Sequence, residues 1–391
     1  MSRRGEVLVG LALATIGVVG ALAFVEIGVR LLHLVPDRFW EPDPKMGVRL
    51  VASKRGWWTQ EEREFVVPVE INAQGLRDVP RSYAKPPGVY RVLVVGDSFV
   101  EAMHVRLDEM FTRRLERLLD GVSASKRVEV VSAGVSGWGT ASELLWLQEE
   151  GVRYQPNLVL LSFYPGNDIK NNSPNLEETL PPVYDEEGNL RYVRSNKAKG
   201  AENPRLLARS KAYAFLRQLV FLRQPAVGRA LERLGLVRLP PAAAPRLRNG
   251  LPVDYGVYEV PADEVWRDAW RRTERLLREV RDTAGKMGAQ FGIVVIAGRE
   301  QVSGASWDRI LATYPEAKSK QFDLEQPEQW VEQWCQAERV PCLRLTPPFR
   351  AAVAAGQGPL HFWFDGHWTP EGHRVAADEV RKFLLANFPI S

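Results

Sequence analysis

The fold is decided by the stretch Val92-Leu93-Val94-Val95-Gly96-Asp97-Ser98-Phe99. Its first half is a short apolar run, which is typical of a strand buried in a parallel sheet. The run stops at a glycine, an acid and a serine, which are residue types that turns and helix starts favour. In open α/β sheets, ligands bind outside the carboxyl ends of the strands. Ser98 is therefore expected to face a binding crevice, although this turn alone is a weak signal.

Two further apolar runs end in turns that carry complementary groups. Val128–Val131 leads into a glycine-rich turn that includes Gly137, where backbone amides can approach a substrate oxygen closely. Leu158–Phe163 leads into a turn that contains Asn167, whose side-chain amide offers a second donor. Taken singly, each turn is more typical of ordinary strand-to-helix punctuation. The combination carries more weight, because each turn closes a strand of one predicted sheet.

The C-terminal part supplies an acid and a base. Asp365 precedes His367 by two positions, so in an extended loop its carboxylate can accept from one ring nitrogen while the other nitrogen faces outward. Such a pair forms the half of a serine triad that takes up the proton and orients the base. Thr369 is the expected N-cap of a following helix, which would fix the loop. His373 is the alternative base, but it falls inside that helix, where a histidine is more often an ordinary helix residue.

Helical and strand patterns alternate along much of the chain. Residues 109–119 and 276–287 fit amphipathic helices, and residues 291–296 fit a buried strand. This alternation predicts an α/β protein with a parallel sheet and flanking helices. It is interrupted at about residues 170–262, which we interpret as an inserted cap region. Residues 205–239 of that region hold eight basic residues among leucines and aromatics, which favours a cap helix over the alternative, a helix on an anionic membrane surface.

The N-terminus contains the only segment that fits a membrane span. Val7–Val25 is free of charged residues, and as a helix it is about 28 Å long, close to the bilayer core of about 30 Å. Arg3 and Arg4 precede it, which places the N-terminus in the cytoplasm and the rest of the chain outside, in the periplasm or at the cell surface. A cleaved signal peptide is the alternative, but the apolar stretch is longer than a usual signal. The expected divisions are a membrane anchor (1–32), a juxtamembrane stalk that leads into the domain (33–88) and a catalytic domain (89–391).

Composition narrows the classes of partner. The net charge is only +4 on 391 residues and no nucleic-acid-binding motif is present, so we expect no nucleic acid partner. Cys335 and Cys342 are the two cysteines; they either close a small disulfide loop or remain thiols, and their spacing matches no zinc pattern. Twelve tryptophans are compatible with stacking on sugar rings, although tryptophan is also common in cores.

The motifs together resemble those of the SGNH (GDSL-type) hydrolase superfamily. Gly96-Asp97-Ser98, the turn ending at Gly137, Gly166-Asn167-Asp168 and the Asp365/His367 pair look like its four blocks, in order. The resemblance implies a three-layer α/β/α fold in which Ser98 is the nucleophile, His367 the base and Asp365 its orienter. It also implies an oxyanion hole built from the backbone amides of Ser98 and Gly137 and the side chain of Asn167. No cofactor or metal is needed for this chemistry.

One departure refines the resemblance. The commoner family pattern is Asp-x-x-His, whereas this chain has Asp365-Gly366-His367, a form similar to that of membrane-anchored AlgX/AlgJ-like O-acetyltransferases. It implies an extracytoplasmic esterase or O-acyltransferase that acts on small acyl esters, acetyl above all, of a cell-envelope glycan; a transferase would work with a membrane-bound O-acyltransferase partner. A lipid or general carboxylesterase is the alternative, and a catalytically silent module that binds polysaccharide or a partner is a third. The segment Asn72–Arg77 resembles Asn-x-x-Gly-x-Arg segments that precede the serine block in anchored relatives, but the sequence assigns it no chemical role.

Overall fold

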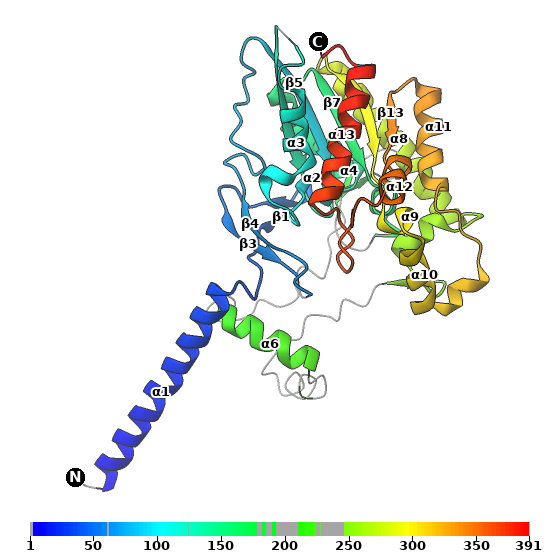
Figure 1. Cartoon of the computed structure of the whole chain (residues 1–391). Helices are drawn as coiled ribbons and strands as arrows, with labels where there is room; N and C mark the ends of the chain where they lie inside the picture. The colour runs from blue at the N-terminus through cyan, green and yellow to red at the C-terminus, as the bar shows by residue number, and fades with distance from the viewer. Residues whose placement is uncertain are drawn as a thin grey trace. The chain divides into compact units, whose positions relative to one another are not determined.

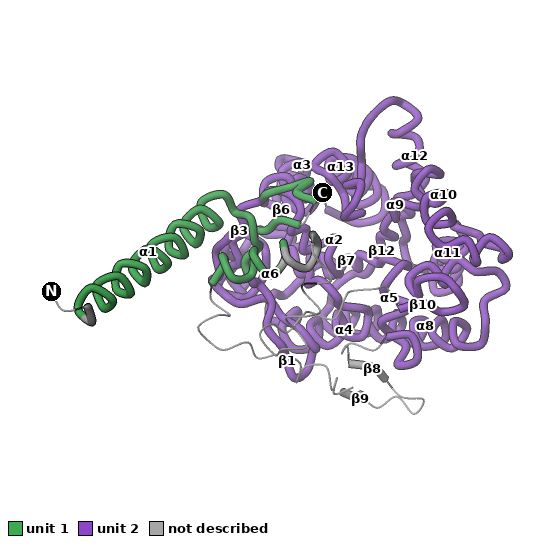
Figure 2. The backbone as a smooth tube through the Cα atoms, turned by 90° about the horizontal axis from the view of Figure 1, so that it is seen from below, with its two compact units in different colours: residues 1–37, 57–66, 196–244 green, residues 38–56, 67–195, 245–391 purple. Residues whose placement is uncertain are grey.

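The computed structural model describes residues 3–60, 62–123, 125–177, 182–184, 190–192, 210–223, 227 and 246–390. The chain divides into two compact units, which Figure 2 shows in green and purple. The first comprises residues 1–37, 57–66 and 196–244, and the second comprises residues 38–56, 67–195 and 245–391. About half of the predicted insertion and more than half of its basic stretch lie outside the described residues.

The second unit is built on a five-stranded parallel sheet. Its strand order is β13-β12-β7-β5-β6, and each neighbouring pair is parallel. The strands are β5 (Val89–Gly96), β6 (Arg127–Gly134), β7 (Leu158–Phe163), β12 (Gln290–Val295) and β13 (Cys342–Arg344). Strands β5 and β7 are buried along their whole length, and apart from Arg91 and Ser162 their side chains are largely apolar, as the continuous hydrophobic runs predict for strands that are covered on both faces.

Helices cover both faces of this sheet, so the fold is the expected three-layer α/β/α sandwich (Figure 1). On one face, α3 (Phe111–Leu119) and α13 (Pro370–Asn387) pack together. Their apolar side chains join Val92 and Val94 of β5 in one buried cluster. Because side chains alternate along a strand, Leu93 points to the opposite face, which α4 (Thr140–Glu149) and α8 (Glu264–Lys286) cover.

The predicted helices agree with these elements, with one difference in length. Thr369 is the N-cap of α13, and its side chain accepts a hydrogen bond from the backbone N–H of Gly372. Helix α8 begins twelve residues before the predicted start at residue 276, because Asp263 caps it and accepts from the backbone N–H of Trp266. Trp266 and Trp270 in its first turns are buried. Charged residues surround them in the sequence, so the apolar pattern of a helix is weak there.

The remaining elements of the second unit connect these layers. Cys335 and Cys342 lie in α11 and β13 and both are free thiols. The short connecting helices are α2 (Ser98–Glu101), η1 (Leu107–Glu109), η2 (Gly151–Tyr154), α5 (Asp168–Asn171), η5 (Val253–Tyr258), α9 (Arg299–Val302), α10 (Gly304–Thr313), η6 (Pro315–Ser319), α11 (Gln326–Glu338) and α12 (Thr346–Ala354). The short strands are β1 (Trp40–Asp43), β2 (Gly47–Leu50), β8 (Pro182–Tyr184), β9 (Leu190–Tyr192), β10 (Leu247–Arg248) and β11 (Leu251–Pro252). Strands β3 (Arg55–Thr59) and β4 (Val66–Glu70) each include residues of both units.

The first unit contains the apolar N-terminal helix α1 (Arg3–Leu31) and α6 (Lys211–Arg223). Gly5–Leu31 contains an 18-residue window with a mean hydropathy of 2.5 and is long enough to cross a membrane, a criterion that a signal sequence would also meet. Glu26 of α1 caps the start of α6, because its carboxylate accepts from Ser210 Oγ and from the backbone N–H groups of Lys211 and Ala212. The two helices of this unit are therefore tied by a charged cap.

Candidate active site

Ser98 stands at the carboxyl edge of the sheet, as the first residue of α2. Asp97, the N-cap of this helix, accepts a hydrogen bond from the backbone N–H of Phe99 at 2.9 Å. Two glycines allow the helix to pack closely on the strand ends. A Cβ at Gly96 would lie 2.5 Å from Val100, and a Cβ at Gly134 would lie 2.5 Å from the backbone nitrogen of Glu101. The serine is thus placed by backbone contacts that leave no room for a side chain.

The structure brings Ser98, His367 and Asp365 together. His367 Nε2 lies 2.8 Å from Ser98 Oγ, and His367 Nδ1 lies 2.7 Å from the Asp365 carboxylate. The acid and the histidine belong to a hairpin in which His361 pairs with Trp368 and the N–H of Phe362 donates to the carbonyl of His367. These distances are those of a nucleophile, a base and an orienting acid in hydrogen-bond contact.

The charge of Asp365 is maintained by its surroundings. Burial alone would raise its pKa, but the hydrogen bond from His367 and the nearby His104 ring lower the pKa well below the usual range. Asp365 is therefore ionised at neutral pH. An ionised acceptor fixes the tautomer of His367 with the proton on Nδ1, which leaves Nε2 free to accept the proton of Ser98 Oγ.

The groups predicted as oxyanion donors also lie at this edge of the sheet. Among the described residues, neither the backbone N–H of Ser98 nor that of Gly137 donates to a protein acceptor. Gly137 has a φ of +85°, a conformation that glycine adopts without strain, and an added Cβ there would meet open space. Asn167 Nδ2 donates to Asp97 at 2.8 Å, which fixes the amide and leaves its second hydrogen for another acceptor.

A family comparison agrees with this geometry. The model of the GDSL-like Lipase/Acylhydrolase family matches residues 94–375, which include all of the residues described above. The chain belongs to this family. It is therefore an acyl-ester hydrolase of the GDSL type, as the four motifs predict. A search of curated proteins found no match.

Solved structures with a similar course of the chain include two acetyl xylan esterases. One is AlAXEase, with 12% identity over 75% of this chain and 98% of that chain, at a TM-score of 0.40. The other is a catalytic mutant of the acetylxylan esterase Axe2 from Geobacillus stearothermophilus, with 12% identity over 77% of this chain and 95% of that chain, at a TM-score of 0.39. At such values we base no inference on these likenesses.

The sequence alone assigns no role to three buried residues around the site of this GDSL-type hydrolase. Glu101, at the end of α2, accepts hydrogen bonds from Trp40 Nε1 and Ser136 Oγ, and burial raises its pKa to about 7. Arg77 donates to backbone carbonyls at the end of α2 and in the loop after it, and His104 stacks on His367. One signal was available in the sequence, because His104 is one of only five histidines and follows the serine block.

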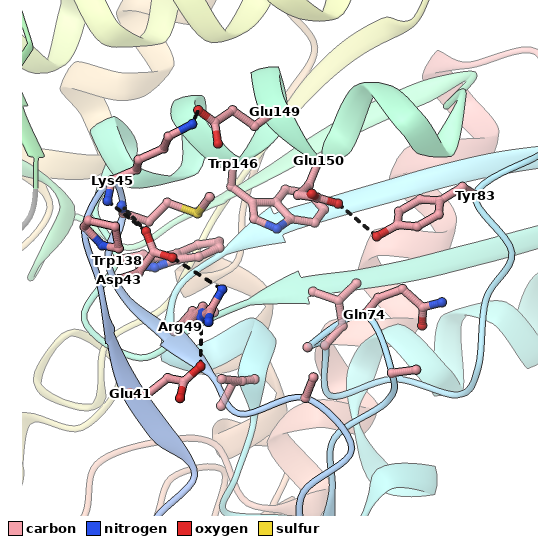
Figure 3. Close-up of a pocket in the computed structure, with 18 residues that line it drawn as sticks. Glu41, Asp43, Lys45, Arg49, Gln74, Tyr83, Trp138, Trp146, Glu149 and Glu150 are labelled. Atoms are coloured by element: carbon pink, nitrogen blue, oxygen red, sulfur yellow. Dashed lines mark hydrogen bonds and ion pairs between the residues drawn. The ribbon is translucent and has the colours of Figure 1, made fainter.

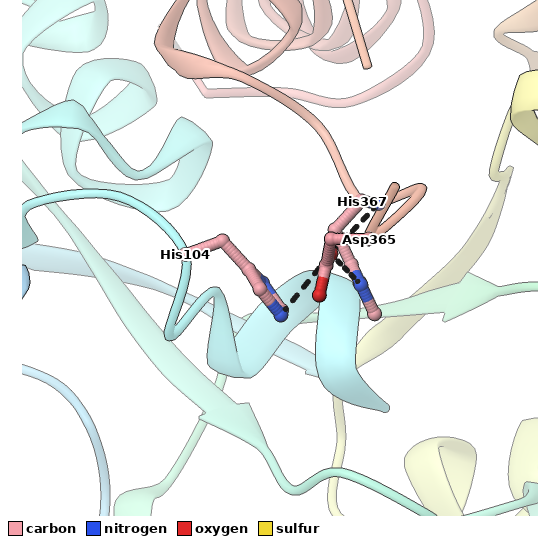
Figure 4. A group of neighbouring side chains, drawn as sticks. All are labelled: His104, Asp365 and His367. Atoms are coloured by element: carbon pink, nitrogen blue, oxygen red, sulfur yellow. Dashed lines mark hydrogen bonds and ion pairs between the residues drawn. The ribbon is translucent and has the colours of Figure 1, made fainter. Parts of the chain in front are cut away.

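His104, Asp365 and His367 also offer three ligand atoms that lie within 4.8 Å of one another (Figure 4). Their arrangement does not suit a metal ion. An imidazole binds a metal in the plane of its ring, and the two rings are stacked with centroids 3.9 Å apart and planes only 13° apart. A single ion cannot lie in both of these planes. The cluster is better explained by contacts among the rings and the carboxylate.

Figure 3 shows a pocket of about 610 Å³ elsewhere in the second unit. Its charged side chains largely pair with each other, as in Lys45–Glu149 at 2.6 Å and Arg49–Glu41 at 2.8 Å. Neither Ser98 nor His367 lines it. This pocket is therefore separate from Ser98 and His367, although Trp138, the neighbour of Gly137, forms part of its wall.

Proposed function

We propose that this GDSL-type hydrolase is a membrane-anchored serine esterase or O-acyltransferase that acts on small acyl esters, foremost acetyl esters, of a cell-envelope glycan. The observation that carries the proposal is the position of His367, in hydrogen-bond contact with Ser98 Oγ on one side and with Asp365 on the other. A base in this position can take the proton of the serine hydroxyl and so make it strongly nucleophilic near neutral pH.

The geometry supports a reaction in two steps. In the first, His367 Nε2 takes the proton of Ser98 Oγ while the oxygen attacks the ester carbonyl carbon. The carbonyl oxygen becomes negatively charged, and the amides of Ser98, Gly137 and Asn167 are the groups that would stabilise it. The tetrahedral intermediate then collapses. The bond to the leaving alkoxide breaks, His367 returns its proton to that oxygen, and an acyl-serine remains.

The second step transfers the acyl group from Ser98 to an acceptor. His367 removes a proton from the acceptor hydroxyl, which attacks the acyl-serine, and Ser98 then regains its proton from the imidazolium. Water as the acceptor makes the protein an esterase, whereas a sugar hydroxyl makes it an O-acyltransferase. Preference for acetyl and for a glycan is supported by the Asp365-Gly366-His367 form of the acid-base pair, which resembles that of the alginate-acetylation branch.

The anchoring proposal rests on α1. We place its N-terminus in the cytoplasm, because Arg3 and Arg4 precede the apolar segment, and the catalytic unit outside the cytoplasm. A transferase in that location would receive its acyl group from a membrane-bound O-acyltransferase partner, because activated acyl donors are made inside the cell.

The proposal is tested with the full chain in detergent and aryl esters of increasing acyl length. We expect hydrolysis of the aryl acetate to exceed that of the butyrate and octanoate, and to be lost in Ser98→Ala. Addition of acetylated and unacetylated oligosaccharides then separates esterase from transferase, since acetyl appears either as free acetate or on the sugar. Equal hydrolysis by wild type and Ser98→Ala would refute the proposed nucleophile, and a preference for octanoate would favour the lipid-esterase alternative.

A further inference from the structure

The segment Asn72–Arg77, which the sequence leaves without a role, forms a tight turn that directs an arginine into the protein. Asn72 Oδ1 accepts hydrogen bonds from the backbone N–H groups of Gln74 and Leu76, at 3.0 and 2.9 Å. Gly75 has a φ of +78°, the left-handed region in which a side chain would be strained. The turn therefore requires both its asparagine and its glycine, and it is immediately followed by Arg77.

Arg77 is fully buried, and its guanidinium binds the loop that follows α2. It donates to the carbonyls of Glu101, at 3.1 Å, and of Ala102 and Val105. Ala102 adopts a left-handed conformation at the end of the helix, so these carbonyls converge on a single cation. Burial lowers the pKa of Arg77 to about 10, which leaves it charged at neutral pH. These hydrogen bonds, which we call the Arg77 clamp, fix the backbone on both sides of His104.

His104 is buried against the catalytic histidine (Figure 4). Its ring lies flat on that of His367, and its Nε2 is 3.5 Å from Asp365 Oδ1. This distance is long for a hydrogen bond, so the attraction between the N–H and the carboxylate is mainly electrostatic. Burial lowers the pKa of His104 well below its usual range, and the neighbouring His367 lowers it further. The His104 ring therefore stays neutral when His367 takes up a proton.

We propose that His104 is a positioning residue that holds the His367 ring in the plane required for proton transfer and shares the Asp365 carboxylate with it. Stacking on the His104 ring restricts rotation of the His367 ring, so Nε2 stays within hydrogen-bond distance of Ser98 Oγ. The N–H of His104 takes part of the negative charge of Asp365. The carboxylate therefore binds the imidazolium less tightly, and the base releases its proton more readily to the leaving group. This inference rests on the proposed function, because it assigns His367 as the base.

Several charged or titratable groups act on the two rings from the surrounding elements. They are Asp365 of the hairpin, Asp97 at the end of β5, the clamp residue Arg77, His361 at the base of the hairpin and His373 of α13. All of these side chains are the same in the wild type and in a variant in which only residue 104 is replaced. A shift in the pH profile of such a variant therefore reports on the contacts of His104.

Two replacements separate the two contacts. His104→Phe keeps a flat ring on His367 and removes the N–H, whereas His104→Gln keeps an N–H and removes the ring. Since an aromatic contact of this kind is worth up to a factor of about ten, we expect kcat of His104→Gln to fall by about threefold to tenfold with little change in KM. In His104→Phe the acid limb of the kcat/KM profile should move upward by about half a pH unit, because Asp365 then interacts with His367 alone.

His373→Gln is the matched control, because this buried histidine accepts from the backbone N–H of Phe111, and burial lowers its pKa well below the usual range, so the replacement removes no charge near the rings. It should lower stability without moving the pH profile. Unchanged kcat and pH profiles in both His104 variants would overturn the proposal.

A second readout does not depend on turnover. In the full chain labelled with ¹⁵N-histidine, the proton between His367 Nδ1 and Asp365 should give a strongly downfield signal that moves in His104→Phe and stays in place in His373→Gln. An unmoved signal would contradict the inference even if one variant folded poorly. Absence of esterase activity in the wild type would instead count against the proposed function, and the position of this signal would still decide the role of His104.

Discussion

Replacement of Gly134 by alanine tests how the nucleophile is positioned. A Cβ at this position would lie 2.5 Å from the backbone nitrogen of Glu101 and 2.5 Å from Val100 Cβ. Ordinary contact requires about 3.5 Å, so α2 must move by about 1 Å. Because Ser98 is the first residue of that helix, its Oγ would leave the 2.8 Å contact with His367 Nε2.

The expected effect is larger on catalysis than on stability. A misplacement of about 1 Å costs about 10²-fold in rate, whereas an overpacked methyl group costs about 1–3 kcal/mol of the free energy of unfolding. The assay compares kcat/KM for an aryl acetate with denaturant unfolding. Gly285→Ala in α8 is the matched control, because an added Cβ there meets nothing within 4 Å; it should leave kcat/KM unchanged and stabilise the helix by about 0.5–1 kcal/mol. The reasoning fails if kcat/KM of Gly134→Ala stays within about threefold of the wild type.

Further replacements test the acid-base pair, the oxyanion donor and one buried acid. Asp365→Asn should lower kcat by about 10³- to 10⁴-fold in a folded protein, because His367 loses the acceptor that fixes its tautomer; near-normal turnover would remove Asp365 from the triad. Asn167→Ala should lower kcat by about 10²- to 10³-fold, and a larger change in KM than in kcat would contradict its role. His373→Ala should retain activity but lose about 1–3 kcal/mol of unfolding free energy, since a buried backbone N–H loses its acceptor. If His373→Ala lost activity and His367→Ala kept it, His373 would be the base. Burial raises the pKa of Glu101 to about 7, so the stability that its neutral form contributes is present below pH 4.5 and lost as the pH rises through 7. Glu101→Gln does not titrate at this position, so its free energy of unfolding relative to that of the wild type should increase between pH 4.5 and 7, by at most about 3 kcal/mol in denaturant unfolding. A difference between the two proteins that does not change with pH would refute the raised pKa.

The sheet and the loop that carries Asp365 and His367 were predictable because local patterns encode them, whereas the hairpin form of that loop was not predicted. Buried parallel strands require continuous apolar runs, so β5 and β7 were visible in the sequence as such. The N-cap Thr369 marked the start of α13, and this start separated His367, in a loop, from His373, in a helix. The structure keeps that separation: His373 is buried and accepts from a backbone N–H.

Other parts of the site depend on contacts that no local pattern contains. Arg77 binds carbonyls that follow 24 to 28 positions later, so its role requires the path of the chain after α2. The stacking of His104 likewise depends on a hairpin more than 250 positions away. The glycine-rich turn shows the same limit: its composition indicates close backbone approach, but only the packing distinguishes Gly134, which admits α2, from Gly137, whose surroundings are open.

The central claim is that Ser98 is an activated nucleophile, and intact-mass labelling with a small fluorophosphonate tests it most directly. The full chain in detergent is compared with Ser98→Ala and with His367→Ala, after each has been shown to be folded. The account predicts one adduct on the wild type, none on Ser98→Ala and greatly slowed labelling of His367→Ala. A folded wild-type chain that takes up no adduct, or an adduct that persists in Ser98→Ala, would contradict it.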